Sequence, residues 1–378
     1  MIKSAKNNDY ATKKDENKKK KLLMIAYLPS PYWVDFLNIV GQSFDLTVLF
    51  EQKDSKDRKD TWLNRNFENF KATYLPRNIL KRFWTLTKYS HQNYDIFWNC
   101  DYSKWECIYM NFLFKIKNRI ILLHADGGVV IPRKIDFLIS FVMKQATFYA
   151  SSGVECDKYF KYYKVDENKI FHYRFTSLTK DQINNNLKFK AENKYELKQK
   201  MNLKDELIIV SVGRQIYGKG YDVLLKSLVD IQKPMKVFIV GGKPTNLNDS
   251  LKRELKLEYV NFIDFLPFEQ IKQYYAIADV FIMPTRSDVW GLVINEAMSF
   301  GLPIISSDKC AGGVEIINKF QNGIIVETDS IESLQRAIVR IMENSNLLEI
   351  FSKKSVEAIK DYSLENMAND YINILMKL

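Results

Sequence analysis

Short apolar runs alternate with segments of helical period along most of the chain, and this pattern leaves few possible folds. In the first half the apolar runs occupy 22–28, 46–50, 72–75, 96–98, 120–124, 147–150 and 170–173. The second half repeats the pattern at 207–212, 236–240, 260–263, 280–283, 304–306 and 323–326, and three helical segments close the chain. Strands that alternate with helices are typical of parallel sheets covered by helices on both faces.

A polar stretch rich in Asn and Lys interrupts the alternation at 179–202 and divides the chain. We therefore predict an α/β protein with two doubly wound, Rossmann-like domains, 22–180 and 204–378, joined by a linker at 181–203. The length of 378 residues fits two domains of roughly 150 residues each. Ligands of such sheets bind beyond the carboxyl ends of the strands, so we expect the chemistry in the cleft between the domains.

The basic excess of the chain, a formal net charge of +11, lies in its first half. The lysine-rich residues 1–21 are expected to be a disordered tail. Two further basic segments, 81–84 and 115–119, are interleaved with aromatic or apolar residues. Such segments suit a surface that meets anionic lipid headgroups, and a solvated basic surface is the alternative.

Composition disfavours several other classes of protein. The four cysteines and three histidines are scattered, which fits neither a disulfide scaffold nor a zinc site and favours a reducing compartment. The apolar run at 22–28 ends at Pro29, and no stretch approaches the roughly 20 apolar residues of a membrane span. We therefore expect a cytoplasmic protein, soluble or peripheral on the inner membrane face. Nucleic-acid binding is an alternative because of the charge, but no recognition motif supports it.

The first segment that could carry chemistry is 211–220, SVGRQIYGKG, which directly follows the first strand of the second half. Gly213 lets the backbone approach a ligand closely, and the start of the following helix offers free amides. Arg214 and Lys219 add two positive charges. The combination suits a diphosphate, and a glycine turn with two solvated cations is the alternative.

The second such segment is 288–296, DVWGLVINE, which follows the strand at 280–283. Gly291 and Leu292 stand where a helix should begin, so their amides can face a phosphate. Asp288 precedes the helix and Glu296 lies about one turn into it. These carboxylates could hold hydroxyls of a sugar and of a ribose, and two solvated acids at a helix start are the alternative.

Together the two segments resemble family 4 glycosyltransferases of the GT-B architecture, in which two Rossmann-like domains face a central cleft. The resemblance extends to YYAIADVF at 274–281 and GLPII at 301–305, and is strong over about 207–326. PSPYWVDF at 29–36 is similar to a subgroup of capsule and exopolysaccharide transferases. The resemblance implies a retaining hexosyltransferase that uses a nucleoside diphosphate sugar, with UDP as the expected nucleotide. The acceptor would be a hydroxyl of a glycan or of a lipid-linked saccharide, in surface polysaccharide synthesis. The resemblance makes 22–180 the acceptor-side domain and 204–378 the domain that binds the nucleotide sugar.

The resemblance also implies roles for individual residues. Arg214 and Lys219 would bind the donor diphosphate, and Asp288, where the family usually has glutamate, would contact the donor sugar. Glu296 would hold the ribose. The remaining residues expected to contact the donor are Gly213, Leu266, Trp290, Gly291 and Leu292.

In the first half, His124 ends a strand and precedes Gly127 and Gly128. The resemblance implies that it faces the donor sugar, and a structural role is the alternative. No Asp-x-Asp metal motif ends a strand, so neither a metal nor another cofactor is expected. Arg214 and Lys219 would do the work of a divalent ion.

Two alternatives keep the fold but change the function. GT-B folds also serve nucleotide-sugar epimerases, because a fold does not determine a reaction. An inactive partner subunit is conceivable because Asp288 replaces glutamate, but Arg214, Lys219 and Glu296 favour an active enzyme. A basic protein that binds nucleic acid or other anions without catalysis is the non-enzymatic alternative.

Overall fold

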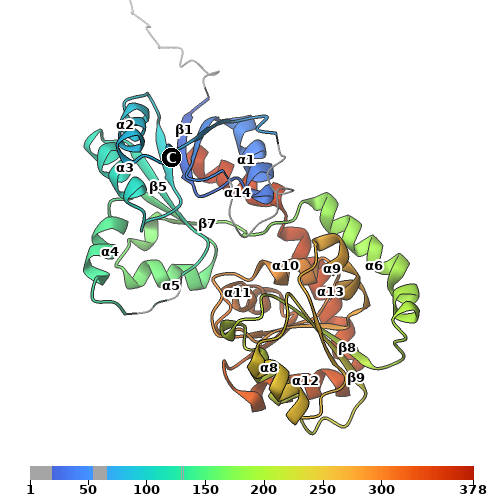
Figure 1. The fold of residues 1–378 in the computed structure, drawn as a ribbon. Helices are drawn as coiled ribbons and strands as arrows, with labels where there is room; N and C mark the ends of the chain where they lie inside the picture. Colours follow the sequence, from blue (N-terminus) through green and yellow to red (C-terminus); the bar gives the residue numbers. More distant parts are fainter. Residues whose placement is uncertain (1–18, 54–65, 129, 131) are drawn as a thin grey trace, which may run out of the picture.

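The computed structural model describes residues 19–53, 66–128, 130 and 132–378, which form two α/β domains (Figure 1). The strands of the first sheet are β1 (Lys21–Ala26), β2 (Asp45–Phe50), β3 (Lys71–Tyr74), β4 (Ile96–Asn99), β5 (Ile120–Ala125), β6 (Phe148–Ser151) and β7 (Ile170–His172). The strands of the second are β8 (Leu207–Val212), β9 (Met235–Val240), β10 (Val260–Ile263), β11 (Val280–Met283), β12 (Ile304–Ser307) and β13 (Gly323–Val326). Every predicted strand is thus confirmed, with its ends within two residues.

Both sheets are parallel and share one topology. Their orders are β3-β2-β1-β4-β5-β6-β7 and β10-β9-β8-β11-β12-β13. In each sheet the strand order reverses beside the first strand, between β1 and β4 and between β8 and β11. Ligands of doubly wound sheets bind at this reversal, so the topology directs attention to the loops after these strands.

Helices cover both sheets. The first domain contains α1 (Pro31–Ser43), α2 (Ile79–Ser90), α3 (Trp105–Ile116), α4 (Asp136–Met143) and α5 (Val154–Tyr162). The second contains α7 (Tyr221–Ser227), α8 (Asn246–Glu254), α9 (Phe268–Ile277), α10 (Leu292–Met298), α11 (Ala311–Phe320), α12 (Ile331–Glu343) and α13 (Ser345–Asp361). No helix in the described ranges combines the length and apolar character that crossing a bilayer requires.

The stretch predicted as a linker, 181–203, is mostly a helix, α6 (Lys180–Lys200), which packs on α9. A capping box starts it, because the side chains of Thr179 and Gln182 each accept a hydrogen bond from the other's backbone N–H. Ile183 is buried on the face toward the domain. The polar composition therefore marks a helix with a narrow buried face, not irregular chain.

The last helix, α14 (Leu364–Lys377), returns to the first domain and packs on α1 (Figure 1). Tyr371 of α14 is buried, with its ring 4.6 Å from that of Trp98 and 5.3 Å from that of Phe36. The prediction that 204–378 form one domain therefore does not hold for α14. Its apolar face is completed by the first sheet, a long-range contact that the local pattern cannot reveal.

The predicted disordered tail, 1–21, lies mostly outside the described residues, which begin at Lys19. Lys21 already belongs to β1. Lys20 Nζ donates a hydrogen bond of 3.0 Å to the carbonyl of Met376, near the end of α14. The first described residues are therefore tied to the last helix of the chain.

Candidate active site

The candidate site lies where loops from the carboxyl ends of the two sheets meet. Gly127, after β5, contacts the second domain so closely that a Cβ atom would lie 2.4 Å from the carbonyl oxygen of Val289. Its φ of +144° also disfavours other residues. A hollow of about 380 Å³ adjoins this contact and is lined by Gly128 and Lys158 from one domain and by Asp288 from the other.

An ion pair joins the two segments that the sequence singles out. Lys219 Nζ lies 2.5 Å from Asp288 Oδ2, and the two side chains are 19% and 21% exposed. Arg214 is exposed on the loop that carries Lys219, and the described residues offer it no ion-pair partner within 4.0 Å. The structure thus brings one predicted cation and one predicted carboxylate together and leaves the second cation directed toward solvent.

The loop that carries Lys219 is held against the end of β11. Gly220 has a φ of +68°, and a Cβ atom there would lie 1.9 Å from the carbonyl oxygen of Pro284. Arg286 donates its backbone N–H to the carbonyl of Gly218, and its guanidinium forms a two-point ion pair with Asp222 at 2.8 and 2.9 Å. Arg286, which sequence reasoning missed, therefore connects the two loops.

Helix α10 begins where the sequence predicts. Gly291 has a φ of +82°, and a Cβ atom there would lie 2.8 Å from Cys310 Sγ, so this N-terminal cap requires glycine. Glu296, one turn later, accepts a hydrogen bond of 2.9 Å from the Tyr275 hydroxyl. Burial raises the pKa of the Glu296 carboxyl to about 7, and the hydrogen bond from Tyr275 opposes this shift. Its ionisation is therefore sensitive to pH near neutrality.

Three predicted donor-binding side chains pack in or against the core of the protein. Trp290 is 3% exposed, donates from Nε1 to Asn295 Oδ1 at 2.9 Å, and packs against Phe175 with 5.7 Å between ring centroids. The ring thus belongs to the buried core, and contact of Trp290 with the donor stays a prediction. Leu266 and Leu292 are partly buried against the same core.

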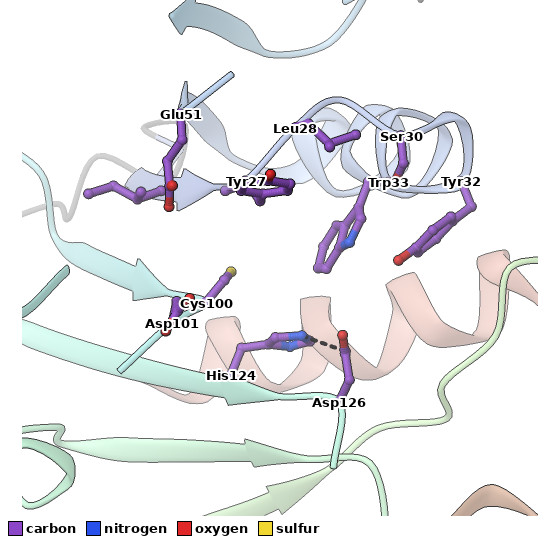
Figure 2. Close-up of a pocket in the computed structure, with 12 residues that line it drawn as sticks. Tyr27, Leu28, Ser30, Tyr32, Trp33, Glu51, Cys100, Asp101, His124 and Asp126 are labelled. Atoms are coloured by element: carbon purple, nitrogen blue, oxygen red, sulfur yellow. Dashed lines mark ion pairs between the residues drawn. The ribbon is translucent and has the colours of Figure 1, made fainter. Parts of the chain in front are cut away.

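His124 lies one residue before the end of β5, faces Trp33 across the pocket (Figure 2) and is almost completely buried. Its Nε2 lies 2.6 Å from Asp126 Oδ1, and its Nδ1 contacts the hydroxyl of Tyr371. The rings of Trp33 and Tyr173 lie 5.4 and 5.3 Å away. The C-terminal helix thus helps to orient the imidazole, which lies between the Tyr371 hydroxyl and the Asp126 carboxylate.

Within the ranges that the structure describes, no group of three or more His, Cys, Asp or Glu side chains could hold a metal ion. The charged side chains that line the hollow beside the interdomain contact include Lys158, Arg286 and Asp288, and Asp288 pairs with Lys219.

Comparison with known sequences relates the second domain to sugar transferases. Residues 193–357 match the family model described as glycosyl transferases group 1. Relatives include an uncharacterized glycosyltransferase of Haemophilus influenzae, 27% identical over 52% of this chain and 56% of that protein. Spore coat protein SA of Bacillus subtilis is 29% identical over 48% of this chain and 52% of its own length. The chain spans about half the length of the curated relatives it matches.

Solved structures resemble nearly the whole chain. A glycosyltransferase from Rickettsia africae has a TM-score of 0.74 at 17% identity, and covers 95% of this chain and 98% of its own. Anabaena HepE in complex with UDP has a TM-score of 0.74 at 15% identity, over 95% of this chain and all of its own. The fold is therefore GT-B, and within it residues 193–357 are similar to glycosyl transferases group 1.

Proposed function

We propose that this chain is a retaining, family 4-like glycosyltransferase of surface polysaccharide synthesis. It moves a hexose or N-acetylhexosamine from a UDP-linked donor to a hydroxyl of a glycan or lipid-linked acceptor. The observation that carries the proposal is the contact between Lys219 and Asp288 beside the start of α10. UDP and UDP-glucose, which occupy the HepE structures, are the nucleotide and donor that we favour.

In the proposed reaction the acceptor oxygen bonds the anomeric carbon as the bond from that carbon to the diphosphate breaks. The acceptor proton passes to the departing phosphate. Lys219 and Arg214 neutralise the charge that develops on the diphosphate, and one such preorganised group lowers the barrier by about 3 to 4 kcal/mol. The backbone amides of Gly213, Gly291 and Leu292 add further donors.

The carboxylates and the histidine position the sugar and the nucleoside. Asp288 accepts a hydrogen bond from a hydroxyl of the donor sugar, and Glu296 accepts hydrogen bonds from the ribose hydroxyls. His124 faces the donor sugar from the first domain. Closure of the two domains on the donor excludes water, which would otherwise compete as an acceptor. No divalent cation takes part in this scheme.

Thermal unfolding with a panel of nucleotides tests this function. A ligand that binds only the folded protein raises the midpoint temperature, and we expect UDP to raise it more than GDP or ADP, with or without EDTA. A panel in which no diphosphate raises the midpoint would contradict the function. If EDTA abolishes the rise in midpoint temperature caused by UDP, only the expected independence of metal is contradicted. Conversion of a nucleotide sugar in the absence of an acceptor would favour an epimerase.

We also propose that the first domain docks on an anionic membrane through α2 and α3, which pack side by side (Figure 1). Large apolar side chains on these helices are exposed to solvent, including Leu80, Trp84, Phe112 and Ile116. Lys81 and Lys115 are exposed between them. Arg82 belongs to the predicted basic segment but pairs at 2.5 Å with the buried Glu106, so it does not contribute to this face.

Flotation with vesicles checks the docking. Each cation near the surface contributes about 1 kcal/mol of attraction, so we expect the protein to float with vesicles rich in anionic lipid at low salt and not with neutral ones. Trp84→Glu should abolish flotation, whereas Tyr195→Glu on α6 should not, although Tyr195 is equally exposed. Absence of flotation at low salt would end the docking proposal and leave a solvated basic surface.

A further inference from the structure

The first domain contains a cavity of about 230 Å³ at the carboxyl ends of its strands (Figure 2). Three carboxylates line it, each after a different strand: Glu51 after β2, Asp101 after β4 and Asp126 after β5. The indole of Trp33, from the first turn of α1, forms another wall and points toward His124 (Figure 2). Pockets for drug-sized ligands hold about 300 to 1,000 Å³, so this cavity suits a single sugar ring.

One buried hydroxyl in the cavity wall lacks a hydrogen bond. Ser30 is 4% exposed and caps α1 without a side-chain hydrogen bond, and its Oγ has no partner among the described residues. His124 Nε2 already has a polar neighbour, Asp126 Oδ1 at 2.6 Å. Folded proteins rarely leave a buried hydroxyl unpaired, so Ser30 indicates a ligand that forms a hydrogen bond in this cavity.

The cavity is negatively charged although its domain is basic. Lys104 Nζ forms an ion pair with Glu51 Oε2 at 3.1 Å and so neutralises this carboxylate. Asp101 accepts hydrogen bonds from the backbone N–H and hydroxyl of Ser103 but, like Asp126, makes no ion pair with a described lysine or arginine. Among the residues that the structure describes, no lysine or arginine lines the cavity. A ligand with a carboxylate or phosphate would therefore meet repulsion from Asp101 and Asp126.

The cavity ends beside the proposed donor site. Asp126 in its wall immediately precedes Gly127, which contacts Val289 of the second domain, and Val289 follows Asp288. A sugar in the cavity would therefore lie at the interdomain contact, next to the loop that is proposed to hold the donor sugar.

We propose that this cavity binds the acceptor's terminal sugar and that this sugar is neutral or carries an amine, but bears no carboxylate or phosphate. The inference rests on the proposed function and specifies its acceptor. Ser30 Oγ and the carboxylates of Asp101 and Asp126 bind hydroxyls, and Trp33 packs on the ring. The basic face of α2 and α3 would then contact the lipid bilayer, and the acidic cavity would bind a sugar without a carboxylate or phosphate.

Ligand-observed NMR with methyl glycosides tests the proposal, with and without saturating UDP. We expect the wild type to bind at least one of the methyl glycosides of glucose, galactose, mannose, glucosamine and N-acetylglucosamine. Methyl glucuronide and methyl galacturonide should bind at least tenfold more weakly than the best neutral ligand. Ser30→Ala should weaken neutral binding about five- to tenfold, as expected for one lost hydrogen bond, with an unchanged midpoint temperature because no internal hydrogen bond is removed.

Charge-neutral variants test the selectivity. Asp101→Asn keeps the oxygen that Ser103 needs and should reduce the difference between neutral and acidic glycosides to below threefold. The control Glu68→Gln makes the same change of charge on the exposed surface of the same domain and should leave the difference intact.

Several results would overturn the proposal. These are no neutral binding in either condition, acidic glycosides that bind as tightly as neutral ones, or normal neutral binding by Ser30→Ala. Displacement of the bound glycoside by UDP-glucose but not by UDP would assign the cavity to the donor sugar instead. Glycoside binding is also measured without nucleotide, so it tests the cavity even if UDP does not bind. A failure of UDP to bind would contradict only the proposed function.

Discussion

Lys219→Ala is expected to lower kcat at least 100-fold and to leave the free energy of unfolding almost unchanged. Removal of one preorganised group that stabilises developing negative charge typically costs 10²- to 10³-fold in kcat. The folding cost is small because the ion pair with Asp288 is partly exposed, and such pairs contribute about 0 to 1 kcal/mol. Steady-state transfer from the best donor of the nucleotide panel, together with urea unfolding, measures both quantities.

Two further variants separate this role from a loss of local order. Lys226→Ala removes an exposed lysine of α7 in the same domain and should retain full activity. If Lys219→Ala fails only because Asp288 is left without its partner, then Lys219→Ala combined with Asp288→Asn should recover activity. We expect no recovery. Transfer by Lys219→Ala within threefold of the wild-type rate would disprove the assignment to the diphosphate.

The sheets could be predicted because strands of a buried parallel sheet are short, continuous apolar runs. The places where prediction failed have a different physical origin. The helix α6 is polar and depends on the capping box at Thr179 and on its contact with α9. The position of α14 depends on packing of Tyr371 against Trp98, which lie far apart in the sequence. The capping box is a local pattern, but neither the contact of α6 with α9 nor that of Tyr371 with Trp98 leaves one.

Some residues of the candidate site could also be predicted from the sequence, and others could not. Lys219 and Asp288 lie in segments whose glycines and strand-end positions are visible in the sequence, and the structure pairs them. Glu51 and Asp101 also follow strands, so a systematic search of strand ends could have found the acidic cavity. Tyr371, 247 residues from His124, could not have been found, because only the return of α14 brings it there.

Glu296→Gln is expected to make the protein more stable at pH 8 and to weaken UDP binding. Burial raises the pKa of this carboxyl from 4.5 to about 7, so the folded state holds the proton more tightly than the unfolded state. The stability contributed by the protonated carboxyl is therefore complete below pH 4.5 and is lost as the pH rises through 7. The amide cannot ionise, so at pH 8 the variant should exceed the wild type by about 2 to 3 kcal/mol in free energy of unfolding.

The same ionisation should strengthen nucleotide binding. Ionised Glu296 can accept a hydrogen bond from each ribose hydroxyl while Tyr275 donates a hydrogen bond to one of its oxygens. The amide of glutamine has a single acceptor oxygen. We expect Glu296→Gln to raise the Kd of UDP at least tenfold at pH 8 and much less at pH 5.5, where the wild-type carboxyl is protonated. Calorimetry at both pH values measures this, and 2′-deoxy-UDP, which lacks one hydroxyl, should differ little between the two proteins. Equal UDP affinity at pH 8 would remove the ribose role. If the variant gains stability but keeps its affinity for UDP, then the ionised Glu296 carboxylate serves a ligand other than the nucleotide. Its burial lowers the free energy of unfolding, and a ligand must offset that cost.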